Sequence, residues 1–327
     1  MALGEFDLIA RYFKRPVRRA VLGIGDDCAL LAPAPGLQLA ISCDMLVQGR
    51  HFFADVDPRA LGHKALAVNL SDLAASGATP RAFTLALALP QVEEAWLQGF
   101  AQGMFALADA HGCELIGGDT TQGPLNICIT VFGDVPAGQA LLRSGAQAGD
   151  DIYVSGSLGD ARLALESLLG RITLPAQALA AARERLERPT PRVALGMALR
   201  GIASSALDVS DGLLGDLSHI LQASQVGAEV HLEATTQLIA ASALWKSATA
   251  GFDQNLLQQC TLAGGDDYEL CFTAAASLRT AVQAAAIAAQ TPVHRIGRIT
   301  AEPGLRVLDA QGQPVTPHWR SFDHFKT

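Results

Sequence analysis

The sequence predicts an α+β protein with two domains, and three observations support this prediction. With 327 residues, 50% of them apolar, the chain is long enough for a large core and more than one domain. Apolar stretches typical of β-strands alternate with helical patterns in both halves. Residues 136–150 are rich in Gly and Ala and have no clear periodicity, as expected of a boundary. We therefore expect one domain at residues 1–140 and a second at residues 141–327.

The first half is expected to combine mixed or antiparallel strands with two helices beside them. Strands are expected at residues 37–47, 81–90, 113–121 and 124–135, and helices at residues 57–78 and 92–112. Asp57 is suited to cap the first helix, with Pro58 in its first turn and Gly77 at its end. The Gly-Asp sequence within residues 113–121 predicts a turn before the last of these strands.

The second half is expected to have the same α+β character. Strands are expected at residues 151–157, 267–273, 292–300 and 305–315, and helices near residues 159–169, 176–188, 190–200 and 276–289. Residues 204–224 indicate a strand that runs through an Asp-rich turn into a helix.

Composition argues against several classes of function. The net charge of −8 and the lack of a basic run argue against a nucleic-acid partner. Six scattered cysteines without a CxxC pair indicate reduced thiols rather than disulfides or a zinc site. The N-terminal segment is short, amphipathic and partly acidic, unlike a signal peptide, and no window approaches the length of a membrane span. We expect a soluble cytoplasmic protein with no membrane partner.

Aspartates recur beside the expected strands. The sequence GIGDDCALL, residues 23–31, places two of them between a Gly-rich turn and an apolar run. The group consists of Asp26, Asp27, Asp44, Asp72, Asp119, Asp208, Asp211, Asp266 and Asp267. Taken singly, each is explained as a turn, a cap or an exposed helix residue, because Asp favours turns and helix starts. However, Asp44, Asp119 and Asp208 interrupt or end apolar strands, where a solvated loop residue is not expected.

Several converging carboxylates would need cations. Two unit charges about 4 Å apart repel by roughly 4 kcal/mol at an effective dielectric near 20. Mg²⁺ suits oxygen-only sites, uses few carboxylates and leaves its other positions to water and phosphate oxygens. The pattern therefore predicts several Mg²⁺ ions that bind a polyphosphate, with Asp27 as a ligand at a strand-end turn and Asp26 as a second candidate.

The expected phosphate site differs from the common ATP-binding motifs. The sequence has no GxxxxGK[ST] loop and no HRD or DFG motif of the protein kinases. Because the chain has only four lysines, metal ions and arginine must neutralise the phosphates. Arg143 is the candidate for contact with the nucleotide, although composition alone explains it equally well as an exposed loop arginine.

Several motifs together resemble a known family. They are GEFDLIARYF, GIGDDCALL, KALAVNLSDLAASGA, LIGGDTTQGPL, RSGAQAGDDIYVSG, LDVSDGLLGDLSHI, GGDDYELCF and FDHF, in this order from residue 3 to the C-terminus. The chain thus resembles the bacterial thiamine-monophosphate kinases. GIGDD and NLSD are shared with a wider superfamily that includes aminoimidazole ribonucleotide synthetase, selenophosphate synthetase and a hydrogenase-maturation protein. GGDDYEL and FDHF indicate the thiamine enzyme.

The resemblance implies transfer of the ATP γ-phosphate to thiamine phosphate, which gives thiamine diphosphate and ADP. It implies an aminoimidazole ribonucleotide synthetase-like fold, in which the N-terminal domain pairs its sheet across a homodimer and a C-terminal α/β domain covers a cleft for ATP and metals. The positions that match the family's Mg²⁺ ligands are Asp27, Ser42, Cys43, Asp44, Asp72, Asp119, Asp208 and Asp211. Those that match its ATP contacts are Gly118, Asp119, Arg143 and Ser210, and those that match its thiamine phosphate contacts are His51, Asp266 and Phe322.

Two of these positions depart from the family pattern. Cys43 stands where threonine is expected, a change that a ligand acting through its backbone carbonyl would tolerate. Asp266 stands where glutamate is usual, so its carboxylate lies one methylene further back.

The residues fit direct phosphoryl transfer. The acceptor phosphate is already ionised at neutral pH, so positioning and charge neutralisation matter more than a strong base. His51 can orient the acceptor and Phe322 can stack on the cationic thiamine, although an ordinary histidine and a core phenylalanine explain them too. The alternatives are another ATP-dependent synthetase of the superfamily, for which the expected cysteines are missing, and a non-catalytic Mg²⁺ or nucleotide sensor.

Overall fold

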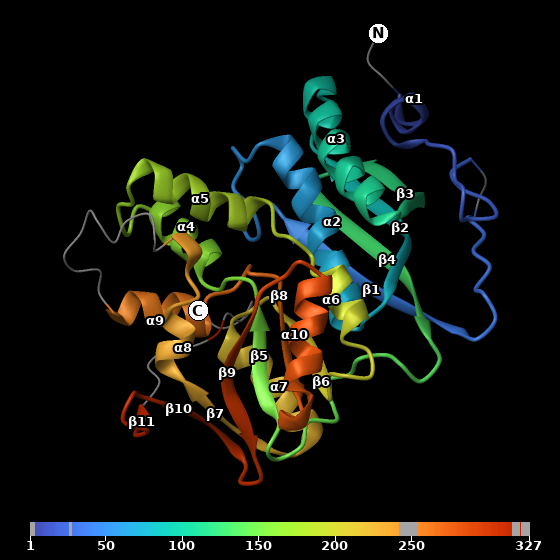
Figure 1. Ribbon diagram of the computed structural model, residues 1–327. Coiled ribbons are helices and arrows are strands. Elements are labelled where there is room, and N and C mark those ends of the chain that lie inside the picture. The colour runs from blue at the N-terminus through green and yellow to red at the C-terminus, as the bar shows by residue number, and fades with distance from the viewer. Residues whose placement is uncertain (1–3, 26–27, 242–253, 316–320, 322–327) are drawn as a thin grey trace. The chain divides into compact units, whose positions relative to one another are not determined.

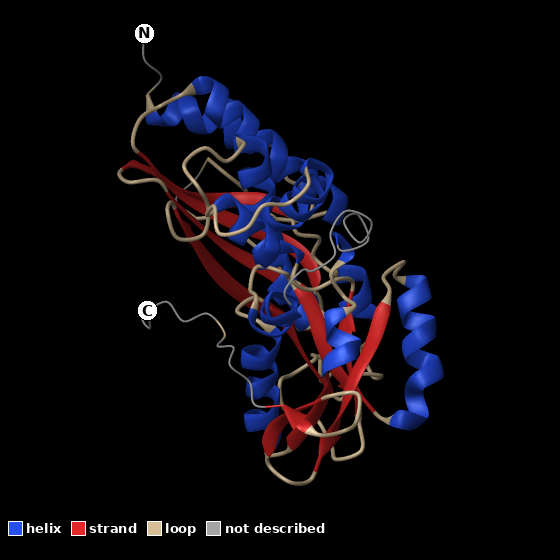
Figure 2. Cartoon of the chain, turned by 90° about the vertical axis from the view of Figure 1, so that its left-hand side faces the viewer, coloured by secondary structure: helices blue, strands red, loops and turns tan. Residues whose placement is uncertain are grey.

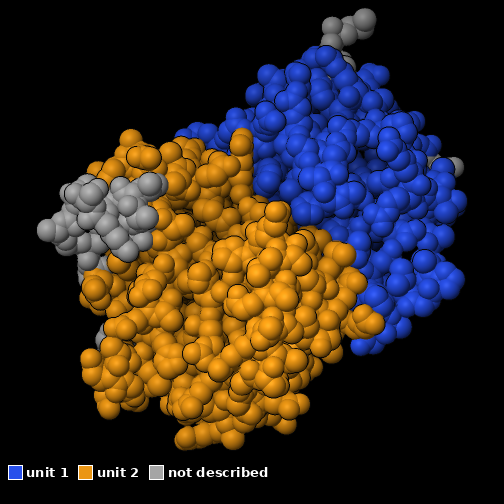
Figure 3. Space-filling view, in the orientation of Figure 1, with its two compact units in different colours: residues 1–73, 78–138 blue, residues 74–77, 139–327 orange. Residues whose placement is uncertain are grey.

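The structure is a computed structural model that describes residues 4–25, 28–241, 254–315 and 321. The chain forms two compact units, which Figure 3 colours separately. Unit 1 consists of Met1–Leu73 and Ala78–Gly138, and unit 2 consists of Ala74–Gly77 and Gln139–Thr327. Each unit has its own mixed β-sheet with helices beside it, so the predicted α+β class is confirmed.

Unit 1 is built on a four-stranded sheet. Its strands are β1 (Leu37–Val47), β2 (Thr79–Leu89), β3 (Glu114–Gln122) and β4 (Asn126–Pro136), in the spatial order β1-β4-β2-β3. Only β2 and β3 are parallel, and the other neighbours are antiparallel. A short α1 (Glu5–Leu8) and the π-helix η1 (Ile9–Phe13) precede the sheet and bury Leu8 and Phe13.

Two long helices, α2 (Pro58–Ala75) and α3 (Glu94–His111), lie side by side against this sheet (Figure 1). They approach closely because glycine faces the backbone of the other helix: a Cβ on Gly62 would lie 2.0 Å from the Phe100 carbonyl oxygen. Asp57 caps α2 as predicted, since its Oδ1 accepts the Ala60 N–H at 2.9 Å. Gly112 ends α3 in the left-handed conformation that favours glycine.

The turn predicted at the Gly-Asp sequence is wrong, because Gly117, Gly118 and Asp119 lie inside β3. The glycines serve a close approach of strands instead. The register between β2 and β3 shifts beside Phe83 and Thr84, and a Cβ on Gly118 would lie 1.9 Å from the Leu85 carbonyl oxygen. Gly118 also has a φ of +145°, which other residues rarely adopt. An irregular strand, rather than a turn, therefore requires glycine here.

Unit 2 is built on a seven-stranded sheet. The strands are β5 (Asp151–Ser155), β6 (Ser205–Val209), β7 (Gly227–His231), β8 (Glu269–Ala274), β9 (Val293–Thr300), β10 (Gly304–Leu308) and β11 (Pro314–Val315). Their spatial order is β11-β10-β7-β9-β5-β8-β6. Figure 2 shows helices on both sides of this sheet. The amphipathic α7 (Leu213–Ser224) buries Leu213, Leu217 and Ile220 in the same apolar cluster as the strands.

The remaining helices of unit 2 form a second apolar cluster or cover the sheet. They are α4 (Asp160–Leu168), α5 (Ala176–Glu187), α6 (Val193–Ala198), α8 (Leu232–Thr236), α9 (Gln254–Ala263) and α10 (Arg279–Ala288), with the 3-10 helix η3 (Ala276–Leu278) before α10. Side chains of α4, α5 and α9 make up much of this second cluster. In the part of the chain that the structure describes, no helix combines the length and apolar character needed to cross a membrane.

Candidate functional site

The described members of the predicted site fall into groups on four parts of the chain. Ser42, Cys43, Asp44, His51 and Asp72 lie on or near β1 and α2, and Gly118 and Asp119 lie on β3. Asp208, Ser210 and Asp211 lie in or just after the end of β6, Asp266 lies in the loop before β8, and Arg143 lies in the loop before β5. Asp26, Asp27 and Phe322 lie outside the described residues.

The first group joins β1 to α2 through polar contacts. Ser42 Oγ donates a hydrogen bond to Asp72 Oδ2, and the Asp44 N–H donates to Asn69 Oδ1 at 3.0 Å. Asn69 and Asp72 are three residues apart, so they lie on one face of α2. These contacts bring the oxygen atoms of Ser42 and Asp72 together beside β1. They are the hard ligands that a Mg²⁺ site requires.

Cys43 has a different environment. Side chains alternate across a strand, so the Cys43 thiol lies on the face of the sheet opposite to Ser42 and Asp44. The thiol is exposed and its Sγ lies 3.4 Å from Cys128 Sγ on β4. Burial raises the pKa of Cys128 to about 11, which keeps that thiol protonated at neutral pH. A thiol is a soft ligand that suits Mg²⁺ poorly.

His51 follows β1, and its hydrogen bonds favour one tautomer of the neutral ring. Its Nδ1 accepts the Val47 N–H at 2.9 Å, and its carbonyl oxygen accepts a bond from Lys64 Nζ at 3.3 Å. An accepting Nδ1 carries no proton, so the neutral ring carries its proton on Nε2. His51 can therefore donate from Nε2 to an acceptor such as a phosphate oxygen.

The second group borders a cavity of about 1070 Å³ in unit 1. Gly118 and Asp119 line this cavity together with apolar side chains, among them Phe13, Leu39 and Phe132. Gly25 and Cys28, on either side of the aspartate pair of GIGDDCALL, also line it. A largely apolar cavity with a few polar groups is typical of a small-molecule site, and its volume suits a nucleotide.

The structure separates the first and second groups within unit 1. β1 and β3 are the two outer strands of the four-stranded sheet. Asp44 and Asp119 thus lie roughly 14 Å apart across the sheet, at about 4.8 Å per strand. The convergence expected of these carboxylates is not seen between this pair.

The third group is held by buried carboxylates that the sequence analysis did not assign. Ser210 and Asp211 follow β6, and the Asp216 Oδ2 accepts the N–H groups of Ser210, Asp211 and Gly212 at 3.0, 3.1 and 3.1 Å. Burial raises the pKa of Asp216 to about 7, against the lowering effect of those N–H groups. Asp216 thereby fixes the segment that carries Ser210 and Asp211.

Asp266 lies in the loop Gly264–Tyr268 and has a left-handed backbone with φ of +65°. Its N–H donates to the Ser210 carbonyl oxygen at 2.8 Å, so the loop and the segment after β6 are joined directly. The left-handed region is several-fold enriched in Asp relative to most other residues. This conformation gives a physical reason for aspartate at position 266.

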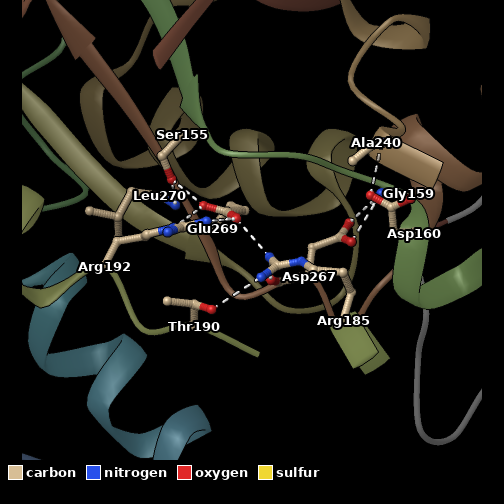
Figure 4. A network of polar contacts seen from close by, with 10 residues as sticks. All are labelled: Ser155, Gly159, Asp160, Arg185, Thr190, Arg192, Ala240, Asp267, Glu269 and Leu270. Carbon is tan, nitrogen blue, oxygen red and sulfur yellow. Dashed lines mark hydrogen bonds and ion pairs between the residues drawn. The ribbon is translucent and has the colours of Figure 1, made fainter. Parts of the chain in front are cut away.

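A network of polar contacts joins this loop to α5 and β5 (Figure 4). The Glu269 carboxylate is fully buried and accepts bonds from Ser155, Arg185 and Arg192. Beside it, both oxygens of the buried Asp267 carboxyl accept the Gly159 N–H, at 2.9 and 3.0 Å. Burial raises the pKa of Asp267 well above its ordinary value of 3.8. Sequence reasoning named Asp267 without a role and missed Glu269, although both lie in the GGDDYEL motif.

Arg143 is exposed, and its carbonyl oxygen accepts a bond from Ser224 Oγ at 3.2 Å. Among the described residues, no three His, Cys, Asp or Glu side chains are grouped so that they could hold a metal ion. The donor set still fits Mg²⁺, which uses one or two carboxylates and completes its shell with water and substrate phosphates. The Ser42–Asp72 pair supplies ligands of this kind.

Comparison with known families places the fold. Residues 25–135 match the N-terminal domain of AIR synthase related proteins, and residues 147–310 match the C-terminal domain. The chain therefore belongs to the AIR synthase related family. The hydrogenase maturation protein HypE shares this fold, with a TM-score of 0.73 at 21% identity over 98% of both chains.

Closer relatives define the group within that family. The thiamine-monophosphate kinases of Salmonella typhimurium and Escherichia coli are 48% and 47% identical to this chain over 333 and 332 residues, covering 100% of each sequence. The crystal structure of thiamine-monophosphate kinase from Stenotrophomonas maltophilia has a TM-score of 0.82 at 46% identity, over 94% of this chain and 95% of that one. AaThiL complexed with AMPPCP and TMP has a TM-score of 0.75 at 28% identity, over 90% and 89%. Within the AIR synthase related family, the chain belongs to the thiamine-monophosphate kinases.

Proposed function

We propose that this chain transfers the γ-phosphate of ATP to thiamine phosphate in a single in-line step. The observation that carries the proposal is the cavity of about 1070 Å³ at Gly118 and Asp119, in a chain similar over its full length to thiamine-monophosphate kinases. AMPPCP is an ATP analogue, and its presence with TMP in AaThiL supports the same pair of substrates here.

ATP binding is assigned to the cavity, which Gly118 and Asp119 line, and to two further contacts. The apolar side chains that line the cavity suit the base and sugar, and Gly118 borders the same cavity. Asp119 is at the polar part of the lining. Arg143 and Ser210 are the proposed contacts from unit 2. The planar guanidinium of Arg143 suits phosphate oxygens in particular.

Mg²⁺ is proposed at the acidic positions of both units. The ligand set is Asp27, Ser42, Cys43, Asp44, Asp72, Asp119, Asp208 and Asp211. Bound Mg²⁺ neutralises phosphate charge, which removes the repulsion between two anionic substrates. Since a thiol binds Mg²⁺ weakly, we expect Cys43 to contribute least of the set.

The acceptor is proposed to be held by His51, Asp266 and Phe322. His51 donates from Nε2 to the phosphate of thiamine phosphate, a role that its accepting Nδ1 makes available. The Asp266 carboxylate attracts the cationic thiamine, and Phe322 stacks on it. The acceptor phosphate oxygen is ionised at neutral pH, so no residue has to remove a proton from it.

We further propose a homodimer formed through the unit 1 sheet, acting in the cytoplasm. Ile41 and Met45 of β1 are 59% and 52% exposed on the face that carries Cys43, and a second sheet would cover them. The thiols of the described cysteines are free, as expected of a reducing compartment.

A coupled ADP-release assay tests the proposed acceptor. Thiamine phosphate should support turnover, whereas unphosphorylated thiamine and aminoimidazole ribonucleotide precursors should not. Equal turnover of thiamine and thiamine phosphate would refute the assignment, and turnover of an aminoimidazole precursor alone would favour another synthetase of the family.

A further inference from the structure

The loop Gly264–Tyr268 has a backbone shape that needs support. Asp266 and Tyr268 have φ values of +65° and +51°, and neither is glycine. Residues in the left-handed region are strained unless their surroundings over-determine them, and such residues cluster where a protein binds its ligands. Asp266 is half-buried, whereas the next residue, Asp267, is buried.

Backbone bonds hold the loop on one side. The N–H groups of Asp266 and Tyr268 donate to the carbonyl oxygens of Ser210 and Val209, both at 2.8 Å. These bonds connect the loop to the segment of Ser210 and Asp211. Because Asp216 holds that segment independently of the loop, the segment is a fixed anchor for this side of the loop.

The Glu269 network, which consists of Ser155, Arg185, Arg192 and Glu269, holds the loop on the other side (Figure 4). Arg185 Nη2 donates both to the Asp267 carbonyl oxygen at 3.3 Å and to Glu269 Oε1 at 2.7 Å. One guanidinium thus joins the main chain of the loop to the buried carboxylate. A long arginine side chain loses much rotamer freedom when it is held, so an unsupported Arg185 would hold the loop poorly.

Glu269 is itself fixed on two further sides. Arg192 donates to it from Nε and Nη2, both at 2.6 Å, and Ser155 donates from Oγ at 2.6 Å. Gly156 has φ of +56°, and a Cβ there would lie 2.1 Å from Glu269 Oε1, so the backbone of the strand end leaves room for the carboxylate. Each member of the network is therefore held by at least one other member.

We propose that Glu269 is a positioning residue for substrate binding. Through Arg185 it holds the loop Gly264–Tyr268 in the shape that presents the Asp266 carboxylate to the thiamine moiety. This inference rests on the proposed function, since it assigns to Asp266 the contact with thiamine phosphate. It adds Arg185 and Arg192 as residues that act on the substrate only through Glu269 and the loop.

The chain offers a matched control for a test. Asp151 is also buried between two arginines in unit 2, with Arg279 Nε at 2.6 Å and Arg295 Nη1 at 3.3 Å. It lies at the start of β5, whereas Ser155 of the Glu269 network lies at its end. Glu269→Gln and Asp151→Asn each remove one charge from a similar ion-pair arrangement, but only Glu269 supports the loop.

Steady-state kinetics of the full chain should separate the two variants. Glu269→Gln is expected to raise the KM for thiamine phosphate by about tenfold, the effect of weakening one bond to a charged group, and to change the KM for ATP less than about twofold. Asp151→Asn is expected to lower the melting temperature and leave both KM values unchanged. A rise of both KM values in Glu269→Gln, or the same rise in Asp151→Asn, would overturn the inference.

Hydrogen exchange gives a readout that does not depend on the substrate. In Glu269→Gln, the amides of residues 264–268 should exchange about tenfold faster than in the unaltered chain or in Asp151→Asn. Unchanged exchange of this loop would overturn the inference. Lack of turnover by the unaltered chain would instead refute the proposed function, so the two failures are distinguishable.

Discussion

Removal of the Asp216 carboxylate should cost both stability and catalysis. In Asp216→Ala, the N–H groups of Ser210, Asp211 and Gly212 lose their shared acceptor. Asp211 is exposed, so water can replace the carboxylate there, whereas Gly212 is buried and Ser210 is half-buried. Because an unpaired shielded donor costs about 1–3 kcal/mol, we expect the free energy of unfolding to fall by roughly 2–4 kcal/mol. Urea denaturation measures this difference.

The same change should lower kcat, since Asp216 fixes the segment that carries Ser210 and Asp211. We expect a loss of at least about tenfold under conditions in which the variant is folded, because misplacement by about 1 Å costs up to 100-fold. Asp309→Ala is the control: Asp309 accepts the N–H groups of Gln311 and Gln313 near β11, at the opposite edge of the sheet from β6. A kcat loss of equal size in the control, or a stable Asp216→Ala with normal kcat, would refute this reasoning.

Three further changes test other parts of the structure. Gly118→Ala should reduce binding of ATP by at least about tenfold. The added Cβ would lie 1.9 Å from the Leu85 carbonyl oxygen and would displace β3 at the cavity. An unchanged KM for ATP would contradict this expectation. His51→Gln should raise the KM for thiamine phosphate by about 10- to 100-fold, the range for one bond to a charged group, with little effect on ATP; equal effects on both substrates would remove His51 from the acceptor site. Arg279 lies beside Asp151 and lowers the pKa of that carboxyl below its ordinary value of 3.8. The ion pair therefore stabilises the fold above about pH 4, and this stabilisation is lost as the pH falls through the lowered pKa. In Asp151→Asn, the free energy of unfolding should therefore fall less steeply as the pH is lowered below about 4. The same pH dependence in the variant and the unaltered chain would show that the ion pair does not contribute to stability.

Local signals explain why the main elements of unit 1 could be predicted. The strand predicted at residues 37–47 matches β1, and α2 and α3 end within a few residues of their predicted bounds. Asp57 acts as the cap that the sequence indicated, and α3 ends at Gly112, the last residue of the helix expected at residues 92–112. Apolar periodicity and capping depend on neighbours in the chain, so a single sequence contains most of the information.

Long-range pairing explains what could not be predicted. β7 is short and lies between β9 and β10, whose residues come more than 60 positions later, so its own sequence gave little indication of a strand. The Gly117–Gly118 pair was interpreted as a turn because the approach of Leu85 from β2 is not visible along the chain.

For the candidate site, too, local features could be predicted from the sequence and long-range contacts could not. Residue types and motifs placed Asp44 and Asp208 correctly in apolar strands, but they did not indicate that β1 and β3 are opposite edges of one sheet. Nor could they indicate that Glu269 is buried, because its partner Ser155 lies 114 positions earlier. A carboxylate is buried only where partners neutralise it or hydrogen-bond to it, and here those partners come from segments that are distant in the sequence.

The transfer of label from γ-labelled ATP tests the central claim most directly. Without thiamine phosphate, the protein should remain unlabelled, because the two phosphates are proposed to react with each other and not with a side chain. When thiamine phosphate is added, the label should appear in thiamine diphosphate at the rate at which ADP is released. Stoichiometric label on the protein that is then chased into thiamine diphosphate, or no label in thiamine diphosphate at all, would contradict the account.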